Sequence, residues 1–434
     1  MEKFFKLKEL NTDIKTELLA GLTTFATMSY IIVVNPKLLA AAGMPFGASM
    51  SATIIAAFIG SLIMGLYAKK PFAMAPYMAE NAFIAYTVVL ALGFNWQSAI
   101  TAIFISAFIF FIFTLIKLRP WLVNSMPKTV KLSFSAGLGL FLILVGLTET
   151  GIIEFTQNSV PIQIGNIANP TVILSVFCFI LTVVLMQKKI KGAILTGILT
   201  TTIIGLLIGD IALPEKLVSM PPSILPIAGQ LDFESVLNIK FLPMFFIIFL
   251  LVYVDTMGAL IGVSYRANLL DKDGNLPEIE KPMLSDSIAT MVSSAMGMST
   301  TGVYLESITG IESGGKSGLT AITVGLLFLS GLFFSPMLSI IPPYAYAPAL
   351  IIVGMLMVSI IAKIDFEDIT EYVPALFSIA VMVFSYNVGI GMASAFILYP
   401  TLKLLSGRGK ETNIATWILF LFAIGFFILY PYQK

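Results

Sequence analysis

The sequence predicts an all-α polytopic membrane protein. Of its 434 residues, 58% are hydrophobic and 11% are charged, and the mean hydropathy is +0.96. A soluble protein of this size has no interior large enough for so much apolar surface, so we expect lipid to cover part of it. The chain also contains a series of apolar runs long enough to cross a bilayer, joined by short polar loops.

Composition excludes several classes of function. The net charge of +1 gives no reason to expect a nucleic-acid partner. A single cysteine, Cys178, rules out a disulfide framework, and without histidine any proton handling falls to carboxylates. We find no metal-ligand set and no hydrolase motif, so we expect no enzyme activity, no metal and no cofactor. The charged stretch from Met1 to Glu17 is too polar for a signal peptide, so we expect the first apolar segment to stay in the mature protein.

The spanning segments can be assigned in order along the chain. The apolar runs cover 18–36, 48–67, 72–91, 97–116, 130–147, 171–187, 192–210, 241–264, 282–298, 317–336, 347–362, 372–385 and 387–404. The stretch 303–313 is too short and polar to span alone, and we interpret it as a half-helix. This gives fourteen segments, followed by a further apolar helix near 413–430 that either spans or lies in the interface.

Two segments are interrupted. The third contains Ala75-Pro76, which favours an extended piece followed by a helix. The tenth follows a break at Thr300-Thr301-Gly302. Unpaired backbone at bilayer depth is tolerated only where it lines a protein-enclosed cavity, and such broken helices recur at the substrate sites of secondary transporters.

Weak internal similarity indicates a repeat. The run from Gly93 to Ile103 is echoed by the run from Gly314 to Ile322, and the run from Ala136 to Leu140 falls where the run from Ile352 to Leu356 does. A seven-segment unit repeated once must be inverted in the membrane because seven is odd, and the two interruptions then become equivalent. With the N-terminus in the cytoplasm, most of the 25 Lys and Arg residues fall on the inner side of the plasma membrane.

Three carboxylates stand at bilayer depth, where burying a charge is costly: Glu80, Asp255 and Glu306. Asp255 shares a helix face with Gly258 and Gly262, and small residues there permit close approach of a flat ligand or of another helix. Each acid is either a functional group or one half of a buried structural hydrogen bond.

Four stretches carry a resemblance to a known family: AGLTTFATMSYIIVVNP (20–36), MAPYMAENAFIAYTVV (74–89), DTMGALIGV (255–263) and LSDSIATMVSSAMGMSTTGVYLESITGIESGGKSGLTA (284–321). They resemble the azaguanine-resistance-type purine permeases, a branch of the nucleobase/ascorbate transporters. The resemblance implies fourteen segments in two inverted repeats of seven. It also implies a core domain that moves against a gate domain, and proton-coupled import of hypoxanthine, guanine or adenine.

Carried over by position, Glu306 matches the family's base-binding glutamate, Asp255 an eighth-segment aspartate and Asn81 a third-segment asparagine. We also place Ala79, Thr301 and Gly302 in the substrate site, and expect Asp255 or Glu306 to carry the proton. The sequence departs from the family where Tyr77-Met78-Ala79-Glu80-Asn81-Ala82 replaces Gly-Met-Gly-Leu-Asn-Ala, and where Val252 replaces a common acid. We hypothesise that Glu80 takes the place of that missing acid.

The expected division is a core of 1–116 and 240–336, a gate of 117–239 and 337–405, and a tail of 406–434. The expected partners are a purine nucleobase, protons and the lipid bilayer; a homodimer is compatible with this architecture. The alternative function is transport of another small planar or anionic solute on the same fold. An intramembrane enzyme is a third class that no motif supports.

Overall fold

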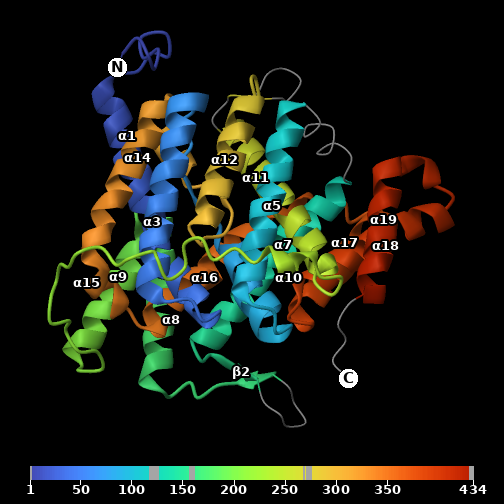
Figure 1. Cartoon of the computed structure of the whole chain (residues 1–434). Helices are drawn as coiled ribbons and strands as arrows, with labels where there is room; N and C mark the ends of the chain where they lie inside the picture. The colour runs from blue at the N-terminus through green and yellow to red at the C-terminus, as the bar shows by residue number, and fades with distance from the viewer. Residues whose placement is uncertain (1, 117–126, 156–161, 267–268, 270–275, 430–434) are drawn as a thin grey trace.

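A computed structural model describes residues 2–116, 127–155, 162–266, 269 and 276–429. Within this part the protein is mostly helical, with helices running between the end that carries the N-terminus and the opposite end, where the small β2–β3 hairpin lies (Figure 1). Eight helices of the described part are long and apolar enough to span a membrane, and five more apolar helices are shorter. The expectation of a polytopic helical protein is confirmed.

The α-helices are α1 (Ile14–Met28), α2 (Ile31–Ala41), α3 (Phe46–Ile63), α4 (Met78–Ala82), α5 (Trp96–Leu115), α7 (Lys128–Glu149), α8 (Pro170–Gln187), α9 (Ala193–Leu207), α10 (Phe233–Leu237), α11 (Leu242–Arg266), α12 (Glu280–Ala295), α13 (Ser307–Glu312), α14 (Gly318–Ser330), α15 (Ser335–Ser339), α16 (Pro343–Val358), α17 (Ile369–Phe384), α18 (Val388–Leu405) and α19 (Ile414–Leu429). Tighter or wider turns form η1 (Met64–Ala68), η2 (Phe83–Ala91), η3 (Gly331–Phe334), η4 (Ser359–Lys363) and η5 (Gly409–Glu411). The strands are β1 (Met74–Pro76), β2 (Ile153–Phe155), β3 (Ile162–Ile164) and β4 (Thr301–Val303).

Polar side chains determine where several helices begin. Asp13, Asn95 and Asn387 each accept a hydrogen bond from a backbone amide in the first turn of α1, α5 and α18. The start of α14 is capped from a distance: the buried carboxylate of Glu17 accepts hydrogen bonds from the backbone amides of Lys316 (2.9 Å) and Ser317 (3.2 Å). Glu17, near the N-terminus, therefore fixes the start of a helix some 300 residues later.

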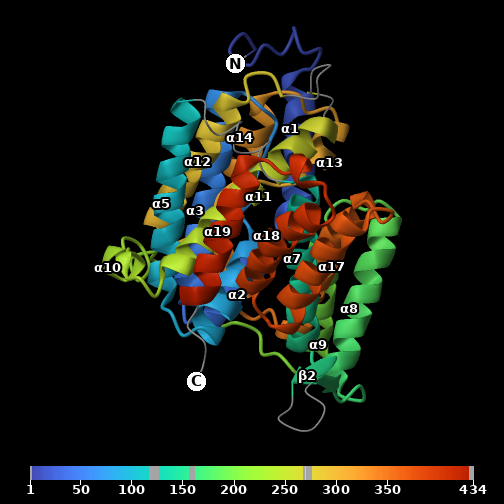
Figure 2. The same ribbon diagram turned by 90° about the vertical axis from the view of Figure 1, so that its right-hand side faces the viewer.

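The helices form two bundles. In the first bundle, α1 to α5 with η2 pack with α11 to α14, and β1 and β4 lie among them. In the second bundle, α7 packs with α16 and α17, and α8 and α9 pack with α16 (Figure 2). The loop before α10 contacts the first bundle, where the amide of Gly229 donates a hydrogen bond to the carbonyl of Ala295 at the end of α12. This loop belongs to residues that the sequence assigned to the gate.

The second bundle is built on a close helix crossing. A Cβ atom on Gly139 of α7 would come within 2.7 Å of the Gly354 carbonyl oxygen on α16, and one on Gly354 would come within 2.4 Å of the Gly139 carbonyl. Only glycine permits this approach, in which the two backbones touch. The two runs that the repeat aligns, 136–140 and 352–356, therefore lie against each other at Gly139 and Gly354.

Candidate functional site

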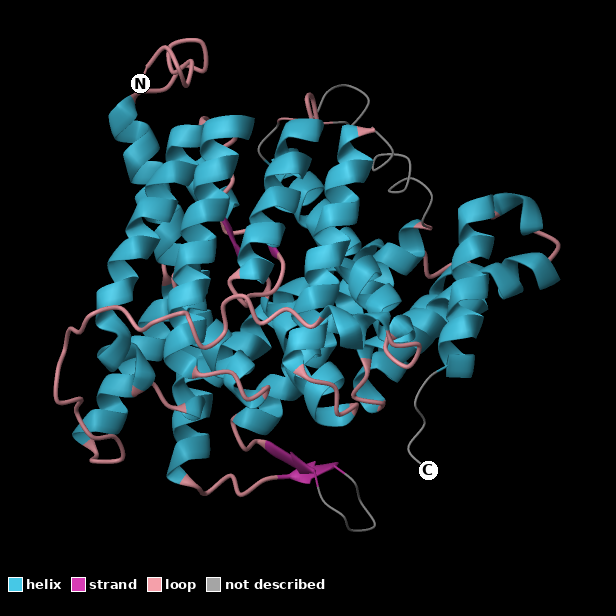
Figure 3. Ribbon diagram, viewed as in Figure 1, coloured by secondary structure: helices cyan, strands magenta, loops and turns pink. Residues whose placement is uncertain are grey.

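Two short strands cross inside the first bundle. Strands β1 and β4 pair antiparallel, with Met74 opposite Val303, Ala75 opposite Gly302 and Pro76 opposite Thr301 (Figure 3). Each strand leads into a short helix, β1 into α4 and β4 into α13. Pairing satisfies backbone groups that a broken helix would otherwise leave open. Both interruptions anticipated from the sequence are therefore present, and they face each other.

A tyrosine follows each strand. The amide of Tyr77 donates to the Thr300 carbonyl (3.0 Å) and that of Tyr304 to the Ala73 carbonyl (2.9 Å). Their hydroxyls donate across the crossing, Tyr77 to the carbonyl of Val303 (3.3 Å) and Tyr304 to that of Pro76 (2.5 Å). The rings are nearly parallel, with centroids 6.1 Å apart and planes at 12°.

Gly302 lies against the hydroxyl end of the Tyr77 side chain. A Cβ atom built on Gly302 would overlap the hydroxyl oxygen and two ring carbons of Tyr77. Such contacts are impossible, so any side chain here would displace the tyrosine or open the strand pair. Gly302 therefore contributes to the site through the space it leaves, and not through a contact of its own.

Glu306 stands at the start of α13, two residues after Tyr304. One carboxylate oxygen, Oε1, accepts a hydrogen bond of 2.7 Å from the hydroxyl of Tyr30, which is 1% exposed on the segment joining α1 and α2. The Glu306 side chain is itself only half-buried. A carboxylate on a residue that is only partly buried can accept a further hydrogen bond from a ligand, because each carboxylate has several acceptor sites.

Thr301 is buried, and its polar groups are used inside the protein. Its hydroxyl donates to the hydroxyl oxygen of Ser293 (2.8 Å), and its carbonyl accepts from the hydroxyl of Thr290 (3.2 Å) on the same helix, α12. Thr301 thus ties β4 to α12. Its observed role is to support the crossing.

In the first half-helix, α4, the polar side chain of Asn81 is bonded within the protein. Ala79 and Asn81 lie buried in α4, and the amide nitrogen of Asn81 donates to the side-chain oxygen of Asn35 on α2. Asn35 in turn donates to the hydroxyl of Thr53 (2.9 Å) on α3. Asn81 therefore anchors α4 to the two preceding helices.

Glu80 is buried on the side of α4 that faces α5 and α11. It lines a small cavity of about 10 Å³, together with Phe83, Ile84, Ile103, Ile248, Leu251 and Val252. The space is apolar and far too small for a nucleobase. Glu80 is an acid that the family pattern lacks, and Val252 stands where the family commonly has an acid. These two residues thus border the same cavity.

Asp255 belongs to α11, one turn beyond Val252. Its side chain lies outside the part of the chain that the structure describes. Within the described part, no group of three or more His, Cys, Asp and Glu side chains is placed to hold a metal ion.

Sequence reasoning missed Tyr30 and Asn35, although both lie in the 20–36 stretch that carried the resemblance. Neither is charged, and nothing in the local pattern distinguishes a tyrosine that binds a carboxylate from one that packs. Their roles depend on partners 276 and 46 residues away.

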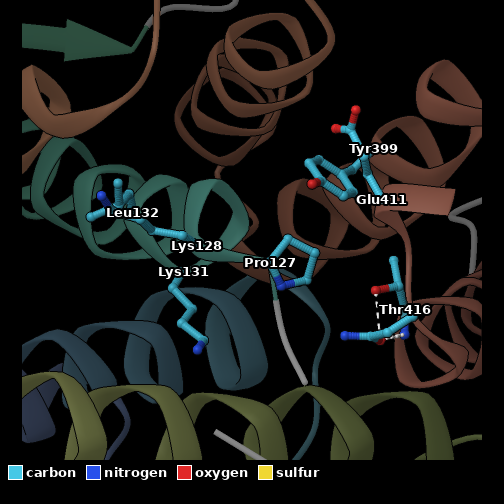
Figure 4. A pocket seen from close by; sticks show the side chains of 8 residues that line it. Pro127, Lys128, Lys131, Leu132, Tyr399, Glu411 and Thr416 are labelled. Atoms are coloured by element: carbon cyan, nitrogen blue, oxygen red, sulfur yellow. Dashed lines mark hydrogen bonds between the residues drawn. The ribbon is translucent and has the colours of Figure 1, made fainter. Parts of the chain in front are cut away.

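A larger cavity, of about 440 Å³, lies between α7 and the region of α18 and α19 (Figure 4). Lys128, Lys131, Tyr399, Glu411 and Thr416 are among the residues that line it. None of its lining residues belongs to the strands or to the half-helices. The cavity is therefore separate from the crossing.

Comparison with known proteins identifies the family of the chain. The sequence profile described as "Permease family" matches residues 15–398. The chain belongs to this permease family. The permease is 38% identical over 429 residues to the adenine permease AdeP of Escherichia coli K12, covering 98% of this chain and 96% of that one.

A second relative of the permease has a different purine in its name. This is the guanine/hypoxanthine permease PbuO of Bacillus subtilis, 38% identical over 431 residues, with 98% of this chain and 99% of that one covered. The fold also resembles the transmembrane domain of the bicarbonate transporter BicA of a cyanobacterium. The TM-score is 0.63 at 18% identity, over 88% of this chain and 97% of that chain.

Proposed function

We propose that the permease is a secondary transporter that imports a purine nucleobase together with protons. The observation that carries the proposal is the half-exposed Glu306 carboxylate, held by Tyr30 at the end of the crossed strands. Full-length relatives named for adenine and for guanine and hypoxanthine support a purine over a pyrimidine or an inorganic anion.

The chemistry of a purine suits this site. A purine has ring N–H donors, ring nitrogen or carbonyl acceptors and a flat apolar body. The Glu306 carboxylate can accept one or two N–H bonds beside the one from Tyr30, and the aromatic rings of Tyr77 and Tyr304 lie at the same crossing. Recognition by a carboxylate of N–H groups does not require a charged substrate, which favours a neutral base over an anion.

The two bundles support a mechanism of alternating access. We propose that the first bundle is the core, which carries the base, and that the second is the gate, within fourteen segments arranged as two inverted repeats. The crossed strands and the Gly139–Gly354 contact each bring together segments that the proposed repeat aligns. Rocking of one bundle against the other then exposes Glu306 to each side in turn.

We propose protons as the coupling ion, with Asp255 or Glu306 as the carrier. The chain contains no histidine, so carboxylates are the groups available for proton transfer near neutral pH. The Lys and Arg distribution predicts that the N-terminus lies in the cytoplasm. We propose that the proton gradient across the plasma membrane then drives uptake.

Competition experiments test the assignment. Uptake of labelled hypoxanthine into cells expressing the permease is measured at two external pH values, with unlabelled adenine, guanine, xanthine or uracil as competitors. We expect at least one unlabelled purine to compete with hypoxanthine, and we expect uptake to rise at the lower pH. The Glu306→Ala variant should reach the membrane but show no uptake at either pH. No purine uptake above that of cells without the permease, together with flux of labelled bicarbonate through it, would favour the anion alternative.

A further inference from the structure

Glu149, the last residue of α7, joins the two bundles through two tyrosine hydroxyls. Its Oε1 accepts a hydrogen bond of 2.8 Å from Tyr86 of η2, in the first bundle. Its Oε2 accepts one of 3.0 Å from Tyr346 of α16, in its own bundle. Glu149 is half-buried, so the two hydroxyl groups replace part of the water that would otherwise surround its carboxylate.

This junction lies at the end of the molecule opposite the N-terminus. The hairpin that begins at Ile153, just after α7, lies at that end (Figure 1). Two further contacts cross between the bundles nearby. The hydroxyl of Thr87 donates to the carbonyl of Tyr386 (3.1 Å), and the rings of Tyr86 and Tyr386 meet edge to face at 6.1 Å. Tyr386 has φ +53°, a left-handed conformation that only a constrained turn imposes on such a residue.

At the other end of the junction, a lysine side chain joins the two bundles. Lys191, before α9, donates to the hydroxyl oxygens of Thr23 on α1 (3.1 Å) and Ser313 after α13 (3.0 Å). The bundles are therefore tied at both ends, by a carboxylate at one and by an ammonium group at the other.

We propose that Glu149 is a positioning residue for transport, acting as the latch that closes the outer entrance to the site. The proposal rests on the proposed function for its meaning, since it requires that the bundles move apart to admit a substrate. Separation at the outer end breaks the bond from Tyr86, which is on the other bundle. It leaves the bond from Tyr346 intact, because Glu149 and Tyr346 move together.

This asymmetry provides a matched pair of variants. Tyr86→Phe and Tyr346→Phe each remove one hydroxyl bonded to the same carboxylate, yet only the first removes a bond between the bundles. In a Cys178→Ala background, Ala79→Cys serves as a reporter beside the crossing, and Leu213→Cys, on an exposed loop, serves as the control for surface protein. A membrane-impermeant thiosulfonate reagent is applied to intact cells.

We expect Tyr86→Phe and Glu149→Ala to raise the labelling rate of the Ala79→Cys reporter about tenfold, the factor that loss of one hydrogen bond to a charged group gives a two-state equilibrium. Tyr346→Phe and Lys191→Met should leave that rate near its starting value, and labelling at position 213 should be equal in all. In the wild-type background, Tyr86→Phe should lower both the KM and the maximal rate of uptake, because the outward-open state binds external substrate but closes less readily.

Equal labelling rates for the two tyrosine variants, whether both raised or both unchanged, would overturn the latch. The labelling assay does not depend on the nature of the substrate. If labelling changes as expected but no purine is transported, the latch stands and the proposed function fails. If purines are transported but the labelling pattern is absent, the proposed function stands and the latch fails.

Discussion

The two halves of the strand crossing share a backbone frame but present different chemistry. In both, a three-residue strand leads to a tyrosine whose amide and hydroxyl bond to the opposite segment, and then to a short helix. In the first half, Asn81 and Glu80 are buried, and Asn81 is bonded to α2. In the second half, Glu306 is half-exposed and is held by Tyr30. The two halves therefore share a frame made by the backbone, and they differ in the acid, Glu306, that we propose binds the base.

Removing the acid of the second half should have the largest effect. Glu306→Ala deletes the acceptor for the base while leaving the crossing intact, because the strand pairing is made by backbone. We expect uptake to fall at least 100-fold, the combined effect of two hydrogen bonds to a charged group at about 1.5–3 kcal/mol each. Initial rates of labelled-purine uptake, normalised to surface protein, measure it.

Disturbing the shared frame should have the next largest effect. Gly302→Ala places a methyl group against the Tyr77 ring, so we expect low uptake and a reduced melting temperature of the purified protein. Gly425→Ala in α19 is the matched control, because its new methyl group meets nothing within 4 Å. A Gly302→Ala variant that transports and melts like Gly425→Ala would show that the ring does not need this space.

Whether a feature of the fold or of the candidate site could be predicted from the sequence depends on how far apart in the sequence the interacting residues lie. The strand breaks were predicted because Pro76 and the Thr300–Gly302 run interrupt apolar segments locally. Glu306 was predicted because an acid at that depth is rare. Tyr30, Glu149 and the Glu17 cap of α14 were missed, because their roles arise from partners brought together only by folding.

Loss of the support for Glu306 should weaken binding without abolishing it. Tyr30→Phe removes the hydrogen bond of 2.7 Å to the carboxylate but keeps the buried ring. We expect the KM for uptake to rise about 10-fold, through a less well oriented acceptor, with little change in maximal rate. A fall in maximal rate at constant KM would instead assign Tyr30 to the transport movement.

The first half should respond less. Glu80→Gln keeps the shape of a side chain that lines the small cavity beside Val252. If Glu80 replaces the missing acid, its loss should change affinity and the pH dependence of uptake by a few-fold, and adding Val252→Glu should restore part of it. Unchanged affinity and pH dependence in Glu80→Gln would end that hypothesis.

An ionic cluster outside both halves should have the smallest effect on uptake. Arg408 donates to Asp368 and Glu411. Hydrogen bonds from the Thr370 hydroxyl and Arg408 hold the pKa of Asp368 below its ordinary value. Those from Arg408 and Lys403 lower the pKa of Glu411 to about 2.

Both pKa values are lowered by folding. The stabilisation is therefore complete above the unfolded-state values of about 4 and is lost as the pH falls toward about 2. Arg408→Gln should leave the uptake profile unchanged between about pH 5 and 8. Its melting temperature should be lower than that of the wild type at neutral pH, with a difference that shrinks on strong acidification. A shifted uptake profile would place proton coupling in this cluster instead.

The most direct test is a structure of the permease with a transported purine bound. The account predicts the base at the end of the β1–β4 crossing, with a ring N–H donating to Glu306 and with Tyr30 still bonded to the same carboxylate. A base bound elsewhere, for example in the cavity beside Lys128 and Lys131, with Glu306 making no contact to it, would contradict the central claim.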